Sequence, residues 1–392
     1  MVLLKMRRTI FLHTKTDFSK TFMKKFFKIV IHMTTLTAPA MLLLGCYSIH
    51  VDPLESKLFP LIAYGFPFIF LLNSLSLLLF LFLKSWKLFT INLLVIVFGF
   101  SYFNNYYAFG SSEDYVDEDL KILSYNVRCF NIGDAFEIPR EVIRDSIFRF
   151  ISAQDADVFC FQEMYHEHIK RKYAQLTEIK NITKTNYHAS TENDVGGRNR
   201  YVGSYIFSKY PILNQGIVEL NTGESHQGKC LFADIKLPDN QMIRIYNFHL
   251  ASLRYQKQEY DFVENLNSEV ALDEQNKVAG KRVISMFLNA ARRRSKELAI
   301  LLKHASQSPY PTVLCGDLND TPTSNAYHRF EENYLDAFLQ AGTGFGKTYS
   351  GRMPSNRIDY IFHSQHFKTV NFEIQQEVLS DHQGISAYLR WK

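Results

Sequence analysis

The sequence predicts an α/β domain of about 270 residues that follows an all-α membrane region. Two observations predict this division. Three long stretches without Asp, Glu, Lys or Arg lie within the first 112 residues, and from Leu120 onward short apolar runs alternate with amphipathic helical patterns. Of the 392 residues, 46% are hydrophobic and 21% are charged, which excludes a disordered chain. Five cysteines without a CxxC pair exclude a disulfide-dense scaffold and a zinc ribbon.

The three uncharged stretches are Ile29–Val51, Leu58–Leu83 and Leu88–Ser112. A helix needs roughly 20 mostly apolar residues to cross a membrane, so each stretch is long enough. Buried core helices are the alternative, but three such runs separated by a few residues favour a membrane. The third stretch becomes polar and aromatic after Phe103, as at a membrane interface. We therefore expect three transmembrane helices within residues 29–112.

The charge distribution predicts the orientation of these helices. Eleven of the 44 Lys and Arg residues, but three of the 39 Asp and Glu residues, lie in residues 1–110, so this part carries +8 and the remainder −3. The positive-inside rule places the basic residues 1–28 in the cytoplasm. Three crossings then place the acidic linker 113–119 and the domain 120–392 outside the cytoplasm, in a multi-pass membrane protein.

Two features of the N-terminal region stay open. Leu43-Leu44-Gly45-Cys46 resembles a lipoprotein cleavage box, but two further apolar stretches follow Cys46, which disfavours lipidation. Met23, followed by two lysines, resembles a natural start, which would make residues 1–22 an extension. The sequence does not decide the second point.

From Leu120 onward the chain alternates strands and helices. Strands are expected where a short apolar run ends at a polar residue, and helices where apolar residues recur every three or four positions. The expected strands are 121–125, 157–161, 203–207, 242–248, 311–315 and 357–362, and the expected helices lie within 139–151 and 298–305. Several strands deliver a carboxylate, amide or imidazole near their end, which predicts that these groups converge on one rim. Residues 254–296 are polar and predict an inserted or substrate-side segment.

The polar residues at these strand ends are weak signals one at a time. Asn126 could be a turn residue, Glu163 a helix N-terminal acid, His249 a satisfied core histidine and Asp359 the partner of Arg357. As an ordered set they are more specific. The set is Leu123-Ser-Tyr-Asn126-Val-Arg, Phe161-Gln-Glu163, Asn247-Phe-His249, Gly316-Asp317-Leu-Asn319, Arg357-Ile-Asp359-Tyr-Ile and Ser380-Asp381-His382.

This set resembles the endonuclease/exonuclease/phosphatase superfamily, also called the DNase I-like family, over roughly Leu120 to Leu389. The resemblance implies a four-layer sandwich of two mixed β-sheets flanked by helices. It also implies Mg²⁺-dependent hydrolysis of a phosphate ester, with Mn²⁺ as an alternative ion. A hard divalent cation with oxygen ligands suits this reaction, because it neutralises the charge that develops on the phosphoryl group.

The resemblance also implies a role for each motif residue. Glu163 is the expected main metal ligand, with Asn126 as a second oxygen donor and Asp381 on the ion or its water. His382 is the expected general base and Asp359 its partner, because a carboxylate fixes the tautomer of an imidazole. His249 is expected to donate to a phosphoryl oxygen. Asp317 and Asn319 are expected to orient the attacking water and the phosphate.

Other motifs give weaker evidence of function. Residues 341–348, Ala-Gly-Thr-Gly-Phe-Gly-Lys-Thr, fit a loosened phosphate-loop pattern, but the residues that follow are poor helix formers, so we interpret them as a loop. Lys347 could still contact a substrate phosphate, as could Arg198 in a Gly-rich loop. Cys160 and Cys315 fall in expected core strands, where free buried thiols are expected.

Three function classes are compatible with the sequence. The first is a membrane-tethered phosphodiesterase, endonuclease or phosphatase, whose substrate is a lipid head group, a nucleic acid or a small phosphodiester. The net charge of −3 argues against a nuclease, although Arg292–Arg294 could form a basic patch. The second is a non-catalytic membrane-anchored binding module, which the complete motif set disfavours. The third is transport, which uncharged helices disfavour. No obligate protein partner is evident.

Overall fold

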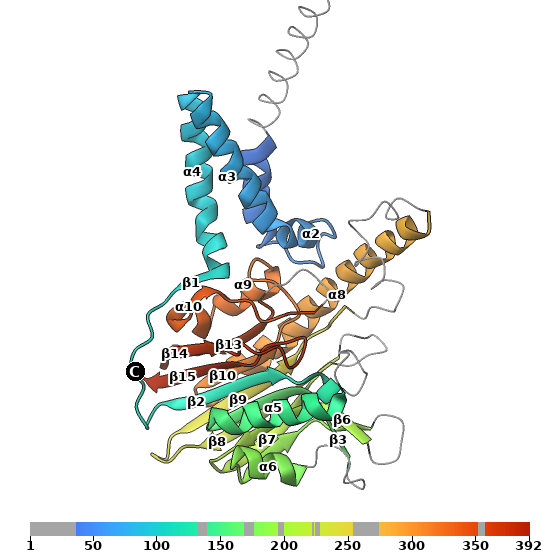
Figure 1. Ribbon diagram of the computed structural model, residues 1–392, viewed down its shortest axis with the longest axis vertical. Helices are drawn as coiled ribbons and strands as arrows, with labels where there is room; N and C mark the ends of the chain where they lie inside the picture. The colour runs from blue at the N-terminus through green and yellow to red at the C-terminus, as the bar shows by residue number, and fades with distance from the viewer. Residues whose placement is uncertain are drawn as a thin grey trace, which may run out of the picture. The chain divides into compact units, whose positions relative to one another are not determined.

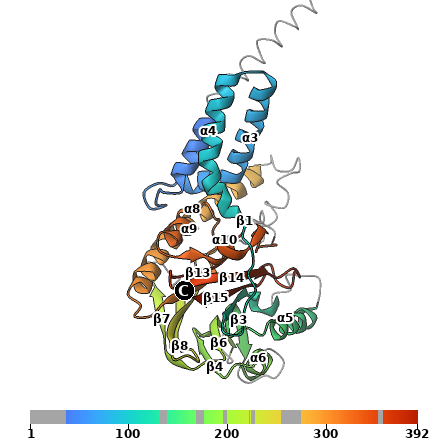
Figure 2. The ribbon, with the colours of Figure 1, turned by 90° about the vertical axis from the view of Figure 1, so that its left-hand side faces the viewer.

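The structure, a computed structural model, describes residues 37–131, 139–167, 176–194, 200–221, 223, 228–253, 274–351 and 357–392. Internal contacts divide the chain into two compact units. We call Met1–Ser48 with Gly65–Phe103 the helical unit, and Ile49–Tyr64 with Asn104–Lys392 the sheet unit. Figures 1 and 2 show the elements of both units.

The helical unit contains a helix at Thr37–Ser48, α3 (Phe66–Phe82) and α4 (Trp86–Phe103). Among the described residues, one helix, Trp86–Tyr106, is long and apolar enough to cross a membrane, and the other two are shorter apolar helices. The sequence predicted three spans. This finding supports one candidate and leaves the number of crossings open.

Two of the three predicted spans have different bounds in the structure. The stretch 58–83 is divided into α2 (Phe59–Tyr64) and α3, with Gly65 as the N-cap of α3. Pro67 explains the break, because proline lacks the N–H that would continue the preceding helix but fits a first turn. The stretch 88–112 ends as a helix at Phe103 and continues as a 3₁₀ turn, Asn104–Tyr106. The first part of stretch 29–51 lies outside the described residues.

The helical unit buries polar side chains and exposes apolar ones. Asn92 Nδ2 donates to Asn73 O and to Ser76 Oγ, at 3.1 and 2.8 Å, and Asn73 Nδ2 donates to Ala38 O at 2.7 Å. All three side chains are buried. The outward residues of α3 and α4 include Leu72, Leu75, Leu78, Leu94 and Val97, each more than half exposed. The unit also buries apolar side chains, including Leu42, Phe66 and Phe80, so its unusual feature compared with a water-soluble helical protein is its apolar surface.

The sheet unit contains two mixed β-sheets. One has six strands in the order β11 (Leu335–Asp336), β13 (Asp359–His363), β10 (Thr312–Asp317), β9 (Met242–His249), β8 (Gly228–Lys236) and β7 (Ile212–Leu220). The other has seven strands, β14 (Phe367–Ile374), β15 (Ile385–Trp391), β2 (Leu120–Asn126), β3 (Val158–Glu167), β6 (Arg200–Ser208) and β4 (Tyr187–Ser190), with β5 (Asn193–Asp194) also paired to β6. The pairs β9–β10 and β2–β3 are parallel, which makes each sheet mixed.

Helices cover the outer faces of both sheets, as Figure 2 shows. Among the described residues, the helices of this unit are α2 (Phe59–Tyr64), α5 (Arg140–Gln154), α6 (Leu176–Thr183), α8 (Glu274–Ser306), α9 (Asn325–Glu331) and α10 (Ala337–Ala341), with 3₁₀ turns at Asn104–Tyr106 and Arg128–Asn131. One apolar cluster lies between the sheets, a second between the six-stranded sheet and α8 and α9, and a third between the seven-stranded sheet and α5 and α6. These clusters separate four layers, which confirms the expected fold class.

Alternation along the strands explains this layering. Val313 and Cys315 of β10 face the cluster between the sheets, whereas Leu314 faces the helices. Because both faces of the strand are covered, its apolar residues form an unbroken run rather than an alternating one. Cys160 and Cys315 are buried and free, as expected.

Two segments that adjoin the helical unit in the sequence belong to the sheet unit. Asp52 Oδ1 accepts a hydrogen bond from Ser295 Oγ of α8 at 2.8 Å, and Ala63 O accepts from Thr323 Oγ1 at 3.0 Å. The strand β1 (Tyr107–Phe109) pairs with β12 (Thr343–Phe345). Farther along, Arg390 bonds to Asp119 at 2.7 and 2.8 Å. The predicted boundaries at 113 and 120 stay predictions, but residues from 104 onward pack within this unit.

Candidate active site

Three chemical groups lie in one row across the six-stranded sheet. His249, the last residue of β9, is the register partner of Asp317, the last residue of β10. Asp317 is in turn the partner of Asp359, the first residue of β13. Gly316 makes this approach close, because its φ of 145° is rare for other residues and a Cβ there would lie 1.9 Å from Phe248 O. The Gly-Asp motif therefore places a carboxylate between an imidazole and a second carboxylate.

The seven-stranded sheet supplies Asn126 and Glu163. Asn126 is the last residue of β2, and the neighbouring strand β3 has a register shift between Phe161 and Met164. Glu163 lies in this irregularity with a φ of 50°, unusual for a residue with a side chain. Gln162 is fully buried, whereas the Glu163 side chain is 35% exposed. The bulge therefore turns Glu163 toward the other sheet's rim.

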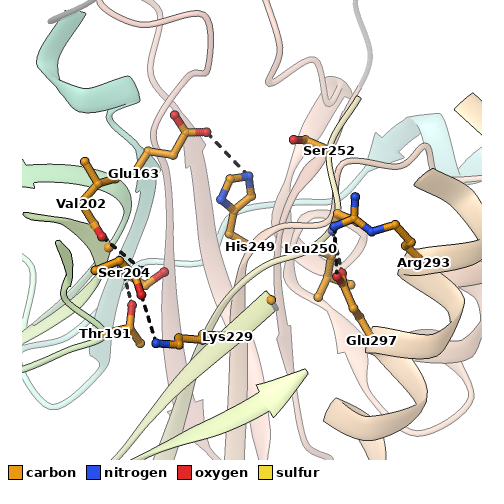
Figure 3. A pocket seen from close by; sticks show the side chains of 14 residues that line it. Glu163, Thr191, Val202, Ser204, Lys229, His249, Leu250, Ser252, Arg293 and Glu297 are labelled. Carbon is orange, nitrogen blue, oxygen red and sulfur yellow. Dashed lines mark hydrogen bonds and ion pairs between the residues drawn. The ribbon is translucent and has the colours of Figure 1, made fainter. Parts of the chain in front are cut away.

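Short contacts join the two sheets at this point. Asn126 Nδ2 lies 3.3 Å from Glu163 Oε1 and 3.2 Å from Asp317 Oδ2. His249 Nε2 lies 3.6 Å from Glu163 Oε1 and 3.7 Å from Asp317 Oδ2. Figure 3 shows the Glu163 carboxylate turned toward the His249 ring. The ends of both sheets thus contribute to one polar cluster.

His382 and Asp359 form a hydrogen-bonded pair beside this cluster. His382 Nδ1 lies 3.0 and 3.1 Å from the two carboxylate oxygens of Asp359, and its Nε2 lies 3.6 Å from Asp317 Oδ2. Thr348 Oγ1 accepts from the backbone N–H of Asp359 at 3.1 Å, and the Tyr349 ring lies edge-on to the His382 ring. A carboxylate on Nδ1 leaves Nε2 to accept or deliver a proton.

The cluster lies within a part of the chain that matches a known family. The sequence profile of the endonuclease/exonuclease/phosphatase family matches residues 123–382, which contain every residue of the cluster. The chain belongs to the endonuclease/exonuclease/phosphatase family. Members of this family are generally phosphate ester hydrolases and typically depend on a divalent metal ion. A second profile, of a domain of unknown function, matches residues 24–106.

Solved structures of the family share the fold at low sequence identity. An endonuclease/exonuclease/phosphatase from Beutenbergia cavernae has 20% identity and a TM-score of 0.51, with 70% of this chain and 72% of that chain covered. One from Bacteroides vulgatus has 18% identity and a TM-score of 0.51, with 70% and 99% covered. The human Nocturnin catalytic domain has 16% identity and a TM-score of 0.47, with 71% and 96% covered. No curated protein matches the sequence.

The family motifs also contain residues whose position only the structure reveals. Gln162 Nε2 donates to Asn247 Oδ1 at 2.7 Å and to Ser124 Oγ at 3.1 Å, so it links the two sheets beneath the site. Arg128 Nη1 lies 2.8 Å from Asp381 Oδ2. Both residues occur in the sequence motifs, but nothing in the sequence assigned them a role. Thr348, which holds the backbone of Asp359, is the last residue of the rejected phosphate-loop pattern, and the sequence assigned it no role.

Arg357 takes part in a different interaction from the one considered as the alternative for Asp359. Its Nη1 lies 2.5 Å from Asp336 Oδ2, and its guanidinium lies over the rings of Phe338 and Tyr360, at 4.6 Å in each case. Arg357 is buried. The Arg-Ile-Asp motif therefore divides its two charges, with Arg357 in the core and Asp359 in the site.

The pKa values of the site reflect its crowded charges. Burial disfavours the charged form of His382, but the carboxylates of Asp359 and Asp317 outweigh burial and raise its pKa to about 10. Burial raises the pKa of Asp317 to about 6, although the imidazolium of His382 opposes this shift. His382 must lose a proton before it can act as a base. A cation bound to the neighbouring carboxylates would favour that loss.

The donor set fits a hard divalent cation. Four carboxylates, those of Glu163, Asp317, Asp359 and Asp381, lie in or beside the cluster, and among the described residues Arg128 is paired with the last of them. Three of them, with the two histidines, leave an excess of negative charge that would repel a phosphate ester. Oxygen-rich sites of this kind suit Mg²⁺ or Mn²⁺.

The candidate ligands differ in how well they are placed to bind a metal ion. Glu163 combines a carboxylate with partial exposure, and Asp317, Asp359 and His382 form a second buried group with ligand atoms within 4.8 Å of one another. Asn126 directs its Nδ2 at the carboxylates, while its Oδ1 accepts from Arg128 N at 3.1 Å. In this orientation Asn126 positions Glu163, and ligation through oxygen would require its amide to turn. The predicted ligand set of Asn126, Glu163 and Asp381 stays a prediction.

A pocket of about 320 Å³ adjoins the site and includes Glu163 and His249 in its lining. Figure 3 shows Lys229 on one wall and the Arg293–Glu297 pair on another. Lys229 Nζ donates to Asn193 Oδ1 at 3.0 Å, and Glu297 Oε2 accepts from Ala251 N at 2.7 Å. Burial raises the pKa of Glu297. The pocket can therefore receive a polar group next to the reacting phosphate.

The remaining predicted contacts have different outcomes. Asn319 is part of the site, since its N–H donates to Asp317 Oδ1 at 2.8 Å. Lys347 is exposed and stays a predicted contact, and Arg198 lies outside the described residues. Residues 343–345 form a strand, which agrees with the rejection of a phosphate loop over residues 341–348. Arg294 is buried and bonds to Asp320 at 2.9 Å, so it does not join Arg292 and Arg293 in a solvent-facing basic patch.

Proposed function

We propose that the protein is a metal-dependent hydrolase of phosphate esters that its helical unit holds at a membrane. One observation is the main support for hydrolase activity. At the facing ends of the two sheets, the site brings together Glu163, His249, Asp317 and the Asp359–His382 pair. Such a cluster would cost stability in a purely structural role, because its buried carboxylates are only partly paired.

Each residue has a task that follows from its contacts. Nε2 of His382 takes a proton from the attacking water, and Asp359 on Nδ1 stabilises the resulting imidazolium. Asp317, 3.6 Å from that Nε2, and Asn319 orient this water and the phosphate. His249 donates to a phosphoryl oxygen as negative charge develops. Mg²⁺, held by Glu163 with Asn126 and Asp381 as the expected further ligands, would supply charge neutralisation.

The membrane tether is supported by the apolar surface and the buried amides of the helical unit. In hydrocarbon, burial of Leu provides no driving force between helices, whereas buried amides and small residues hold helices together. Asn73, Ser76 and Asn92 occupy such positions, and a Cβ at Gly99 would meet Leu42 at 3.1 Å. In water, the same surface of exposed leucines would aggregate.

Chain connectivity limits the topology. Residues 49–64 and residues from 104 onward belong to one compact unit, so they lie on the same side of any membrane. The chain between them, with α3 and α4, must therefore cross an even number of times. If α4 spans, α3 spans too, although its 17 residues cover only about 25 Å. Lys84 and Lys87 at the turn between them then mark the cytoplasmic side.

Reporter fusions test this topology. We expect a cytoplasmic reporter to be active when fused after Leu83 and an extracytoplasmic reporter to be active when fused after Phe109. Fusion within residues 49–64 is expected to report the same side as fusion after Phe109. Reporters after Leu83 and Phe109 on the same side would contradict the paired crossing of α3 and α4.

Hydrolysis is tested with the full chain in detergent. Wild type is expected to hydrolyse at least one member of a panel with Mg²⁺ and to stop with EDTA; the panel holds bis(p-nitrophenyl) phosphate, p-nitrophenyl phosphate, DNA, RNA, sphingomyelin and inositol phosphates. Glu163→Gln and His382→Ala are expected to lower the rate on the order of 10²–10⁴-fold with unchanged circular dichroism. Glu219→Gln, at an exposed position of β7, is the control. A folded wild type inactive on every substrate would instead support a binding module.

A further inference from the structure

The two-stranded ribbon formed by β1 and β12 has one face that packs against the sheet unit and one face that is exposed. Tyr107 pairs with Phe345 and Phe109 with Thr343, so these four side chains share one face, while Ala108 and Gly344 share the other. The inner face is packed, since Ala108 is 2% exposed and belongs to the apolar cluster that includes Ala337 and Phe338 of the α10 region. The outer face is therefore the one that needs an explanation.

Aromatic residues dominate this outer face. Phe109 is 73% exposed and Phe345 is 66% exposed. The Tyr107 ring contacts both, with centroid distances of 4.7 Å to Phe109 and 5.0 Å to Phe345. A solvated ribbon normally has polar residues on its outer face. Three clustered rings, one with a hydroxyl, are typical of the interfacial layer of a membrane.

Chain continuity places this ribbon near the end of the candidate span. The apolar helix Trp86–Tyr106 is followed directly by Tyr107, and Phe109 is three residues from Tyr106, so it lies within about 11 Å of that helix end. Gly346 N donates to Tyr106 O at 3.4 Å, which ties β12 to the same point. These limits hold for any orientation of the helical unit.

The ribbon also continues into the active site. After Phe345, Thr348 Oγ1 holds the backbone of Asp359, Thr348 O accepts from Gln383 N at 2.7 Å, and the Tyr349 ring packs against His382. Tyr349 is the fourth residue after Phe345, which limits the distance between their Cα atoms to about 14 Å. The wall of the site is therefore within reach of the headgroup layer if the ribbon lies in that layer.

We propose that the β1–β12 ribbon is a membrane-contact surface that holds the active-site wall at the level of lipid headgroups, so that the substrate is the phosphate ester of a membrane lipid. This inference rests on the proposed function, since it needs both the tether and the hydrolase. It selects a lipid over a nucleic acid because the surface beside the site wall carries aromatic rings that suit a bilayer interface.

The depth of the ribbon tests the contact directly. The full chain, with Trp86 and Trp391 replaced by Phe, carries Phe345→Trp and is reconstituted into vesicles of phosphatidylethanolamine, phosphatidylglycerol and sphingomyelin, with and without brominated acyl chains. We expect brominated lipid to quench this tryptophan. Leu213→Trp in the same background is the matched control, because Leu213 is 61% exposed on the edge strand β7, and we expect no quenching there.

The activity of a double variant tests the consequence. Phe109→Ser with Phe345→Ser is expected to lower hydrolysis of lipid in the vesicles about tenfold, because two phenyl groups no longer enter the interface. Hydrolysis of bis(p-nitrophenyl) phosphate by the same preparation is expected to stay unchanged, which shows that the site is intact. The readouts are water-soluble headgroup phosphate and nitrophenolate.

Each of the other outcomes overturns one part of the proposal. No quenching at position 345 overturns the membrane contact, whatever the activity. Shielding of that tryptophan from aqueous quenchers without lipid quenching means that a protein or a second copy of the chain covers the ribbon, which also overturns it. Quenching with hydrolysis of DNA but not of lipid overturns the substrate class. A wild type inactive on bis(p-nitrophenyl) phosphate and on lipid, despite quenching, refutes the hydrolase and leaves the contact standing.

Discussion

The helical unit and the sheet unit both bury apolar side chains, such as Phe66 and Ile245, but they differ in the side chains that they expose. In the helical unit, Asn73 and Asn92 are each 1% exposed, while Leu72 and Leu94 are at least 60% exposed. In the sheet unit, the cluster between the sheets consists of aliphatic and aromatic residues such as Ile245, and most polar groups lie at strand ends or on the surface. The two units thus share an apolar interior but differ in their surfaces, since the helical unit exposes many leucines.

The proposed membrane tether would place the two units in two different solvents. In water, burial of apolar area stabilises a fold by roughly 25 cal/mol per Å², and a buried polar group costs free energy unless it is bonded. In a bilayer, the apolar term no longer distinguishes a packed helix from a separate one, so polar bonds and close contacts determine the packing. Buried polar groups therefore contribute differently in the two units, and substitutions can measure the difference.

The largest effect is expected for the buried ion pair of the sheet unit. Asp336→Ala would leave the guanidinium of Arg357 buried without its 2.5 Å partner, although the hydrogen bond to Asn105 O remains. We expect the free energy of unfolding to fall by about 3–5 kcal/mol, because the cost of a buried unpaired charge is not offset by water. Urea unfolding of the full chain in detergent, followed by circular dichroism, measures this change.

An exposed ion pair of the same unit provides the control. Glu113 and Lys368 are bonded to each other, and both side chains are about half exposed. Glu113→Ala is expected to change the free energy of unfolding by about 0–1 kcal/mol. Equal effects of the two substitutions would contradict the assignment of the Arg357–Asp336 pair to the core.

The sequence predicted the strands that carry the chemistry because their local pattern and their tertiary role coincide. Each of β2, β9 and β10 is an apolar run buried on both faces, and each ends at the residue that enters the site. A strand whose sides are both covered shows its burial in its own composition. The edge strand β7 does not, since Asn214, Gln215 and Glu219 interrupt it, and no sequence pattern indicated it.

Other features of the site depend on residues distant in sequence. The bulge that turns Glu163 toward Asp317 depends on the pairing of β3 with β6, about forty residues later. The pairing of β1 with β12 joins segments more than 230 residues apart, so no local pattern predicted it. The break before α3 is different, because Gly65 and Pro67 are local signals of a helix boundary, although we expected one uninterrupted span over 58–83.

A smaller effect is expected when the same kind of substitution is made in both units. Gln162→Leu in the sheet unit would leave Asn247 Oδ1, now 2.7 Å from Gln162 Nε2, buried without this donor. We expect a loss of about 1–3 kcal/mol. Asn92→Leu in the helical unit removes two bonds of 3.1 and 2.8 Å, yet the expected loss is about 0.6 kcal/mol, because the separated helices in a membrane find other partners.

The measurement that separates these two values must keep the solvent of each unit. Unfolding of the sheet unit is followed in urea, and dissociation of the helices is followed by titration of lipid–detergent micelles with a denaturing detergent, both on the full chain. Leu94→Ala is a useful third variant, because Leu94 is 65% exposed, so it is expected to change neither transition. If Asn92→Leu instead destabilised the helices as much as Gln162→Leu destabilises the sheets, the separated helices would not offer these polar groups other partners. The bonds of Asn92 would then be main contacts that hold the helices together.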